Sequence, residues 1–182
     1  MSELLGNTAV SDGLNVRGSE LLGMAVRGGS VVGTIRMGTD VYGPLIPAGK
    51  ADILIGMEPS EALRNIAYLS RSSSVILNTQ TIVPFTVSLG RSSYPSLEKI
   101  VGKLKEFASQ VVMLDAAQIA EEAGSPLAAN IVMLGASFGT GKLPIRIETV
   151  KEAIQSRFPA KLASINLRAF DLGYEKCQQA LK

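Results

Sequence analysis

The sequence predicts one α/β domain built on a parallel sheet whose faces are covered by helices. Three short apolar runs, ADILIGM at 51–57, SVILN at 74–78 and VVMLD at 111–115, alternate with helical patterns. This alternation is typical of βαβ units, and near-continuous apolar strands are typical of a sheet buried on both faces. The chain is 46% hydrophobic but only 5% aromatic, so small aliphatic residues dominate the predicted core. Its 182 residues suffice for one domain with one core.

The residues before this alternation predict a helix followed by a β-hairpin. Glycine is common just after a helix end, and short runs bounded by glycine and polar residues are typical of strands. The expected segments are a helix at 2–11 ending near Gly13, strands at 14–21 and 30–37, a glycine-rich loop at 23–29, a turn at 38–40 and a further hairpin strand at 41–45.

The helices of the α/β part show start signals and apolar spacing. Pro59 suits the first turn of a helix, and Glu61 lies near the positive end of the helix dipole. Between 95 and 109, apolar residues recur on one helical face. The expected helices are 59–69, 95–109, one after residue 115 with Ile119 and Ala120 inward, 128–135, 148–158 and 161–180. The last two form a helical C-terminal tail.

Charge and residue counts exclude several classes of function. The net charge of +2, from 18 basic and 16 acidic residues, gives no field that would attract nucleic acid or anionic lipid. The absence of histidine excludes Ser-His-Asp and Cys-His mechanisms. The single cysteine, Cys177, excludes an internal disulfide and a cysteine-cluster metal site held by this chain alone, and we expect it to be a surface or half-buried thiol. Redox or acyl chemistry would therefore depend on another chain or a cofactor.

Nothing in the sequence predicts a membrane span or a secretion signal. No apolar run reaches the roughly 20 residues that cross a bilayer. The first residues, Met-Ser-Glu, lack a basic region and a long apolar region. A single cysteine also fits a reducing compartment. We therefore expect a cytoplasmic protein that binds neither nucleic acid nor a membrane.

Two candidate sites have simpler structural explanations. The stretch GASFGTGKL at 135–143 resembles a phosphate-binding P-loop, but Ala136 and Leu143 stand where that motif needs Gly and Ser or Thr. A predicted helix also precedes it where a P-loop needs a strand, so a helix end followed by a turn before Pro144 is the better explanation. Glu58 and Asp115 follow predicted strands, where parallel sheets bind ligands, yet either side chain can instead cap the next helix.

The stretch SELLGMAVRGGSVVGTIRMG at 19–38 holds the most specific candidate site. An arginine is followed by two glycines and a serine, which puts a cation beside backbone amides that no side chain screens. Such a turn can hold a phosphate or carboxylate group, and a glutamate earlier in the stretch is placed to orient the arginine. The alternative is a flexible glycine-rich link with a solvated arginine. The candidate binding residues are Arg27, Gly28, Gly29, Ser30 and Glu20.

Four segments together resemble the gamma domain of 2-oxoacid:ferredoxin oxidoreductases. They are SELLGMAVRGGSVVGTIRMG, PLIPAGKADILIGMEPSEALRNIAYL, NTQTIVPFTVSLGRSSYPS and AANIVMLGA. Within them, the motifs Gly-Met-x-x-Arg-Gly-Gly-Ser, Ala-Asp-x-x-x-Gly-x-Glu-Pro-x-Glu-Ala and Asn-x-x-Met-Leu-Gly-Ala follow the family's order. The resemblance runs from about Leu4 to Gly173, and the most similar group is the beta subunit of indolepyruvate ferredoxin oxidoreductases.

The resemblance implies a single gamma-type domain over residues 1–182 with a three-layer, Rossmann-like fold, working inside a larger complex. Such complexes decarboxylate a 2-oxoacid, transfer the acyl group to coenzyme A and reduce ferredoxin. Thiamine diphosphate and iron–sulfur clusters lie on a partner subunit, so this chain is not expected to be catalytic alone. The resemblance also links this domain to coenzyme A, which would meet the Arg27–Ser30 turn at the subunit interface.

The alternative is a non-catalytic structural or binding module that self-associates as a homo-oligomer. Family members usually begin with a strand and a Gly-Gly-Gln-Gly turn, whereas this chain starts inside the helix that should follow. Apolar residues at 21–22 and 25–26 also replace more polar ones. Because the missing strand would be central in the sheet, we expect a gap or an unpaired edge. Recruitment of a thiamine-containing subunit distinguishes the two readings.

Overall fold

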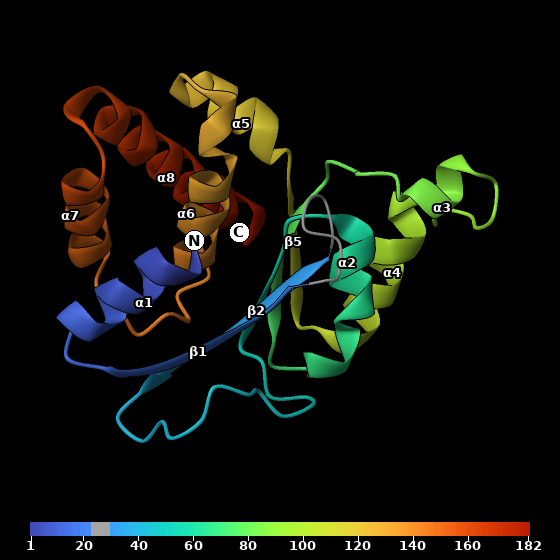
Figure 1. Cartoon of the computed structure of the whole chain (residues 1–182), viewed down its shortest axis with the longest axis horizontal. Helices are drawn as coiled ribbons and strands as arrows, with labels where there is room; N and C mark the ends of the chain where they lie inside the picture. Colours follow the sequence, from blue (N-terminus) through green and yellow to red (C-terminus); the bar gives the residue numbers. More distant parts are fainter. Residues whose placement is uncertain (23–29) are drawn as a thin grey trace.

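The computed structural model describes residues 1–22 and 30–182 and places a parallel sheet between two layers of helices (Figure 1). The strands are β1 Asn15–Leu22, β2 Val31–Gly38, β3 Ile53–Gly56, β4 Ser74–Asn78 and β5 Gln110–Leu114. The helices are α1 Ser2–Ser11, α2 Pro59–Arg64, α3 Phe85–Ser88, α4 Leu97–Phe107, α5 Ala116–Ala123, α6 Ala129–Gly139, α7 Ile147–Arg157 and α8 Ala160–Ala180, with 3-10 turns η1 Ile66–Tyr68 and η2 Pro126–Ala128. The predicted three-layer α/β class is confirmed.

The central strand β4 explains why the sheet has two helical layers. It pairs in parallel with β3 on one side and β5 on the other, and all five of its residues are buried. Val75 and Leu77 pack in a cluster with residues of α2 and α4, whereas Ile76 packs in a second cluster with residues of α6 and α8. Alternate side chains of a strand point to opposite faces, so this apolar run needs a helical cover on both sides.

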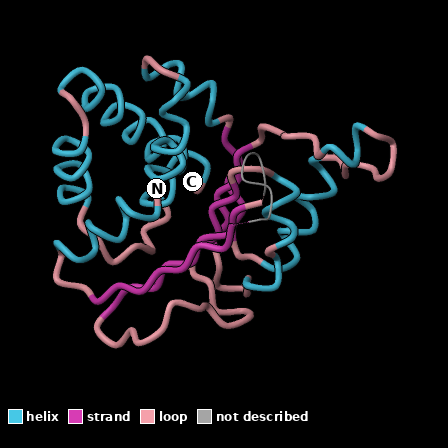
Figure 2. Tube along the Cα trace, viewed as in Figure 1, coloured by secondary structure: helices cyan, strands magenta, loops and turns pink. Residues whose placement is uncertain are grey.

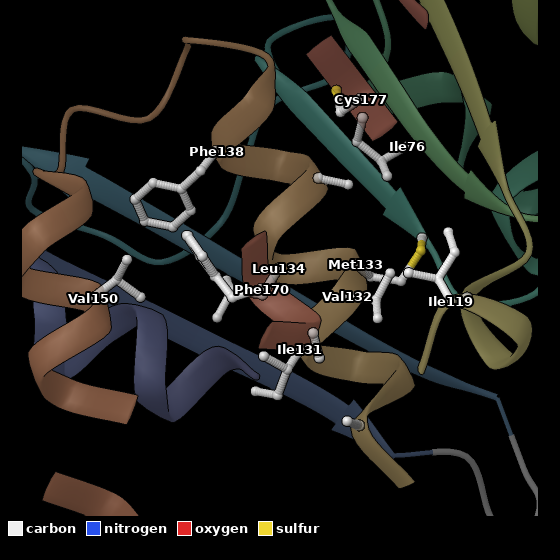
Figure 3. Packing of buried hydrophobic residues seen from close by; sticks show 14 of the residues in the cluster. Ile76, Ile119, Ile131, Val132, Met133, Leu134, Phe138, Val150, Phe170 and Cys177 are labelled. Atoms are coloured by element: carbon white, nitrogen blue, oxygen red, sulfur yellow. The ribbon is translucent and has the colours of Figure 1, made fainter. Parts of the chain in front are cut away.

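Helices α6 and α8 cross at glycines, and this close packing explains why α6 is longer than predicted. Figure 3 shows buried side chains of the two helices beside each other, among them Phe138 of α6 and Phe170 of α8. A Cβ on Gly135 would lie 2.0 Å from the carbonyl oxygen of Phe170, and a Cβ on Gly173 would lie 2.0 Å from that of Val132. Only glycine permits backbones this close. The helix therefore continues through the glycine-rich stretch to Gly139, and the predicted end at residue 135 is wrong because these glycines serve packing rather than termination.

Cys177 is fully buried on α8, so the expectation of a surface or half-buried thiol is wrong. Gly139 of α6 lies opposite it, where a Cβ would come within 2.7 Å of the Cys177 Cβ. The close crossing of α6 and α8, which Gly135 and Gly139 permit, thus encloses the thiol. Burial raises the pKa of Cys177 to about 11, which keeps the thiol protonated at neutral pH.

The N-terminal hairpin is separate from the parallel sheet (Figure 2). β1 and β2 pair from Asn15↔Gly38 to Leu22↔Val31. The predicted strand at 41–45 is wrong, since those residues form a loop whose carbonyl oxygens accept side-chain protons from β2. Arg36 Nη1 donates to Gly43 at 3.2 Å, and Thr34 Oγ1 donates to Pro44 at 3.0 Å. Proline has no N–H to donate to a ladder, so this segment follows β2 without pairing.

An acidic side chain connects the end of α1 to the start of α7. Asp12, just after α1, accepts the backbone N–H and Nη2 of Arg146, both at 2.7 Å, and the Thr149 hydroxyl at 2.6 Å. The Asp12 side chain is only 6% exposed. These bonds hold α1 against the start of α7. Within residues 1–22 and 30–182, no helix is both long and apolar enough to cross a bilayer.

Candidate functional site

The candidate site lies at the carboxyl ends of β3 and β4, the edge at which parallel sheets bind ligands. Asn78, the last residue of β4, is only 4% exposed and holds these ends together. Its Nδ2 donates to the Met57 carbonyl at 3.0 Å, and its Oδ1 accepts the Ala116 N–H at 3.1 Å. One side chain therefore connects the residue after β3 to the first residue of α5.

Glu58 and Asp115 both cap helices, which confirms the structural explanation for each. A Glu58 carboxylate oxygen accepts the Glu61 N–H at 2.9 Å, and Asp115 Oδ1 accepts the Gln118 N–H at 3.0 Å. Capping satisfies a backbone donor that a helix start leaves without an internal partner. Asp115 acts as a helix cap, whereas Glu58 has further hydrogen-bond partners.

Glu58 is 7% exposed and receives donors from several directions. Besides the Glu61 N–H, it accepts the Ser60 hydroxyl at 2.7 Å and the Tyr94 hydroxyl. Burial alone would raise the pKa of Glu58, but these hydrogen bonds outweigh burial and lower it. Burial and the adjacent carboxylate raise the pKa of Tyr94 to about 12. At neutral pH the pair is therefore a carboxylate and a neutral phenol.

Glu61 of α2 holds the start of strand β2 through Ser30. Ser30, the residue before β2, donates its hydroxyl proton to one carboxylate oxygen of Glu61. The other oxygen lies 3.4 Å from Nε of Arg64. Sequence reasoning missed this role for Glu61. The spacing Glu-Pro-x-Glu was the available signal, but its partner lies 31 residues away and no local pattern identifies it.

Two of the five candidate binding residues fall within the described part of the chain. Ser30 and Glu20 both line one open cleft. Glu20 is exposed on β1 opposite Gly33, and the hydroxyl of Ser30 is directed to Glu61 rather than to Glu20. The remaining three, Arg27, Gly28 and Gly29, lie outside the described residues.

The cleft has a volume of about 1540 Å³ and separates the hairpin from β3 and α2. Its lining includes exposed apolar side chains, with exposed fractions of 59% for Val31, 41% for Met57, 70% for Ile82 and 52% for Val83. The outer edge of β3 faces this cleft, and no strand from residues 1–22 or 30–182 pairs with it. A large apolar cleft with a few polar groups is the usual form of a ligand or partner site.

The described side chains around the cleft can bind and position a ligand. Within the two described ranges, no group of three or more His, Cys, Asp or Glu side chains is placed to hold a metal ion. Lys142, in the P-loop-like stretch, donates to the Ser72 carbonyl, so its ammonium serves a structural contact. The thiol of Cys177 is enclosed between helices. None of these groups faces the cleft as a nucleophile paired with a base.

The sequence matches known proteins over nearly its whole length. The model of the pyruvate ferredoxin/flavodoxin oxidoreductase family matches residues 1–176. The chain is 44% identical over 175 residues to the indolepyruvate oxidoreductase subunit IorB of Archaeoglobus fulgidus, covering 96% of this chain and 87% of that protein. Identity at this level over this length supports common ancestry rather than a shared fold alone.

Two solved structures share the fold. The gamma subunit of a keto/oxoacid ferredoxin oxidoreductase from Geobacter sulfurreducens aligns with a TM-score of 0.65 at 20% identity, over 98% of this chain and 90% of that one. A 2-oxoglutarate:ferredoxin oxidoreductase from Magnetococcus marinus, with 2-oxoglutarate, coenzyme A and succinyl-CoA bound, aligns with a TM-score of 0.70 at 16% identity. That alignment covers 98% of this chain but 28% of the larger one, so the fold also occurs as one part of a longer polypeptide.

Proposed function

This chain belongs to the pyruvate ferredoxin/flavodoxin oxidoreductase family, and we propose that it is the gamma-type subunit of an indolepyruvate-type 2-oxoacid:ferredoxin oxidoreductase. The observation that carries the proposal is the 44% identity to an indolepyruvate oxidoreductase subunit over 96% of the chain. The complex would decarboxylate a 2-oxoacid, transfer the acyl group to coenzyme A and pass the electrons to ferredoxin.

The division of labour follows from the side chains that this chain carries. It contains no histidine and one cysteine, and that cysteine is buried. Thiamine diphosphate and the iron–sulfur clusters would therefore sit on a partner subunit, which would also supply the contact with ferredoxin. This chain would form one wall of the interface, in the cytoplasm, and would not turn over substrate by itself.

Coenzyme A would bind at that interface, near the hairpin end. Arg27 would pair with an anionic group of the cofactor, Gly28 and Gly29 would let it approach the backbone, and Glu20 would orient the arginine. Two observations support this placement. Ser30 and Glu20 line one large cleft that runs along β3 and the start of α2, and a longer protein that contains this fold has been solved with coenzyme A bound.

The proposal is tested by reconstituting the complex from this chain and the thiamine- and cluster-containing subunit. We expect indolepyruvate- and coenzyme A-dependent reduction of ferredoxin only when both are present. Arg27→Ala should raise KM for coenzyme A, because it removes the proposed counter-charge. Arg168→Ala, which changes an exposed arginine on α8, is the matched control and should leave the kinetics unchanged.

Unchanged coenzyme A kinetics in Arg27→Ala would remove the assigned role of that turn. Activity of the partner alone, equal to that of the mixture, would refute the subunit function. In that case the self-associating structural module, recovered as a homo-oligomer, becomes the better account of the β3 edge, with which no strand of the described residues pairs.

A further inference from the structure

The Glu58-Pro59-Ser60-Glu61 motif joins three segments that are far apart in the sequence. Glu58 binds the connection between β4 and α4 by accepting the hydroxyl proton of Tyr94. Glu61 binds the hairpin through the Ser30 hydroxyl. The two carboxylates are themselves linked, because the Glu61 N–H donates to Glu58 at 2.9 Å.

These contacts fix the side chains at the mouth of the cleft. Val31 follows Ser30, Met57 precedes Glu58, and Ile82 lies in the connection that Tyr94 attaches to Glu58. All three are exposed apolar residues of the cleft lining. The motif therefore determines how far the hairpin wall stands from the opposite wall.

Neither carboxylate is suited to contact an anionic cofactor directly. Glu58 is 7% exposed and accepts from three donors, the Ser60 and Tyr94 hydroxyls and the Glu61 N–H. One oxygen of Glu61 accepts the Ser30 proton and the other faces Arg64. A serine hydroxyl has a single proton to donate, so Ser30, once bonded to Glu61, has no proton left for a phosphate. Its role in this geometry is to anchor the hairpin.

We propose that Glu61, supported by Glu58, is a positioning residue that sets the affinity of the complex for coenzyme A through Ser30. This inference rests on the proposed function, since it concerns the same cleft. Holding a binding wall in its bound geometry reduces the ordering needed on binding. We call the hydrogen bond between Ser30 and Glu61 the brace. Loss of the brace should raise KM for coenzyme A and leave the chemical step, which belongs to the partner subunit, nearly unchanged.

The test uses the reconstituted complex and four variants. Glu61→Ala removes the acceptor at a helical, half-buried site that tolerates alanine, and should raise KM for coenzyme A about ten-fold, as expected for one lost hydrogen bond to a charged group. Ser30→Ala should have the same effect, and the double variant should be no worse than either single one. Glu61→Gln keeps an oxygen that accepts the Ser30 proton and should restore most of the affinity.

Glu106→Ala is the control, because Glu106 also forms an exposed i,i+3 pair with a basic residue, Lys103 at 2.7 Å, but on α4 away from the cleft lining. It should change nothing. Equal loss of kcat and affinity in Glu61→Ala, or additive effects with Ser30→Ala, would overturn the inference.

Amide hydrogen exchange separates the brace from the proposed function. Glu61→Ala should speed exchange at residues 31–33 and leave α7 and α8 unchanged. If the wild-type complex shows no dependence on coenzyme A, the proposed function fails, and faster exchange at 31–33 still establishes the brace. Unchanged exchange together with unchanged KM would show that the Ser30–Glu61 contact positions nothing.

Discussion

Replacement of Gly135 by alanine should strongly destabilise the fold, although alanine is the better helix former. The new Cβ would lie 2.0 Å from the carbonyl oxygen of Phe170 and 2.8 Å from its carbonyl carbon. Both atoms belong to the backbone of α8, so no side-chain rotation relieves the overlap. Ordinary contact begins near 3.4 Å, so the helices must separate by about 1.4 Å.

The magnitude follows from two opposing effects. Alanine in a helix interior gains about 1 kcal/mol over glycine, whereas inserting a methyl group into a packed core typically costs about 1–3 kcal/mol and sometimes more. Here the separation also loosens the Phe138–Phe170 edge-to-face contact, whose ring centroids are 5.3 Å apart (Figure 3). Because the overlap is with backbone atoms, we place the cost at the upper end of that range, about 3 kcal/mol, and expect a net loss of about 2 kcal/mol in the free energy of unfolding.

Urea unfolding of the isolated chain measures this loss, which corresponds to a midpoint lower by about 1 M. Gly102→Ala is the matched control, because Gly102 is an exposed residue inside α4 whose added Cβ would meet nothing within 4 Å. That variant should gain about 0.5–1 kcal/mol. A Gly135→Ala midpoint equal to or above that of Gly102→Ala would refute the close helix crossing.

Three further predictions concern other buried groups. Asp12→Asn should weaken the α1–α7 contact at neutral pH. Hydrogen bonds from Arg146 and Thr149 lower the pKa of Asp12 from 3.8 to about 2. The contribution of Asp12 to the free energy of unfolding is therefore complete above pH 3.8 and is lost as the pH falls toward 2. A stability difference between wild type and variant that stays constant down to pH 2 would contradict this. Cys177, whose pKa is raised to about 11 by burial, should react with a thiol reagent at pH 8 only after denaturant is added, and rapid labelling of the native chain would contradict its burial. Asn78→Ala leaves the Met57 carbonyl and the Ala116 N–H without their partner and should lower the free energy of unfolding by about 2 kcal/mol or more; an unchanged urea midpoint would show that these bonds are replaced.

The sequence predicted the parallel sheet well because its signals are local. The apolar runs at 74–78 and 111–115 lie within one residue of β4 and β5. β4 is buried at all five residues, so its run of apolar residues is nearly unbroken. The helix-capping roles of Glu58 and Asp115 could also be predicted from the sequence, because a polar side chain before a helix start is a local pattern.

The errors fall where distant segments decide the structure. The glycines at 135 and 139 resemble a helix end, but they lie against Phe170 and Cys177 of α8, which are more than thirty residues later in the sequence. The segment at 41–45 has strand-like composition, yet Pro44 lacks an N–H for a ladder, and the carbonyl oxygens of Gly43 and Pro44 accept side-chain protons from β2 instead. The Ser30–Glu61 contact joins residues from different elements, and no sequence spacing could indicate it.

The central claim is that this chain works as a subunit of a 2-oxoacid:ferredoxin oxidoreductase, and the most direct test is recovery of its partner. A tagged copy should be purified under native conditions from the source organism, and the material bound to it identified by mass spectrometry. The account predicts a large subunit carrying thiamine diphosphate and iron–sulfur clusters, in roughly equal amount to this chain. Recovery of the chain alone, as a homo-oligomer, would contradict it.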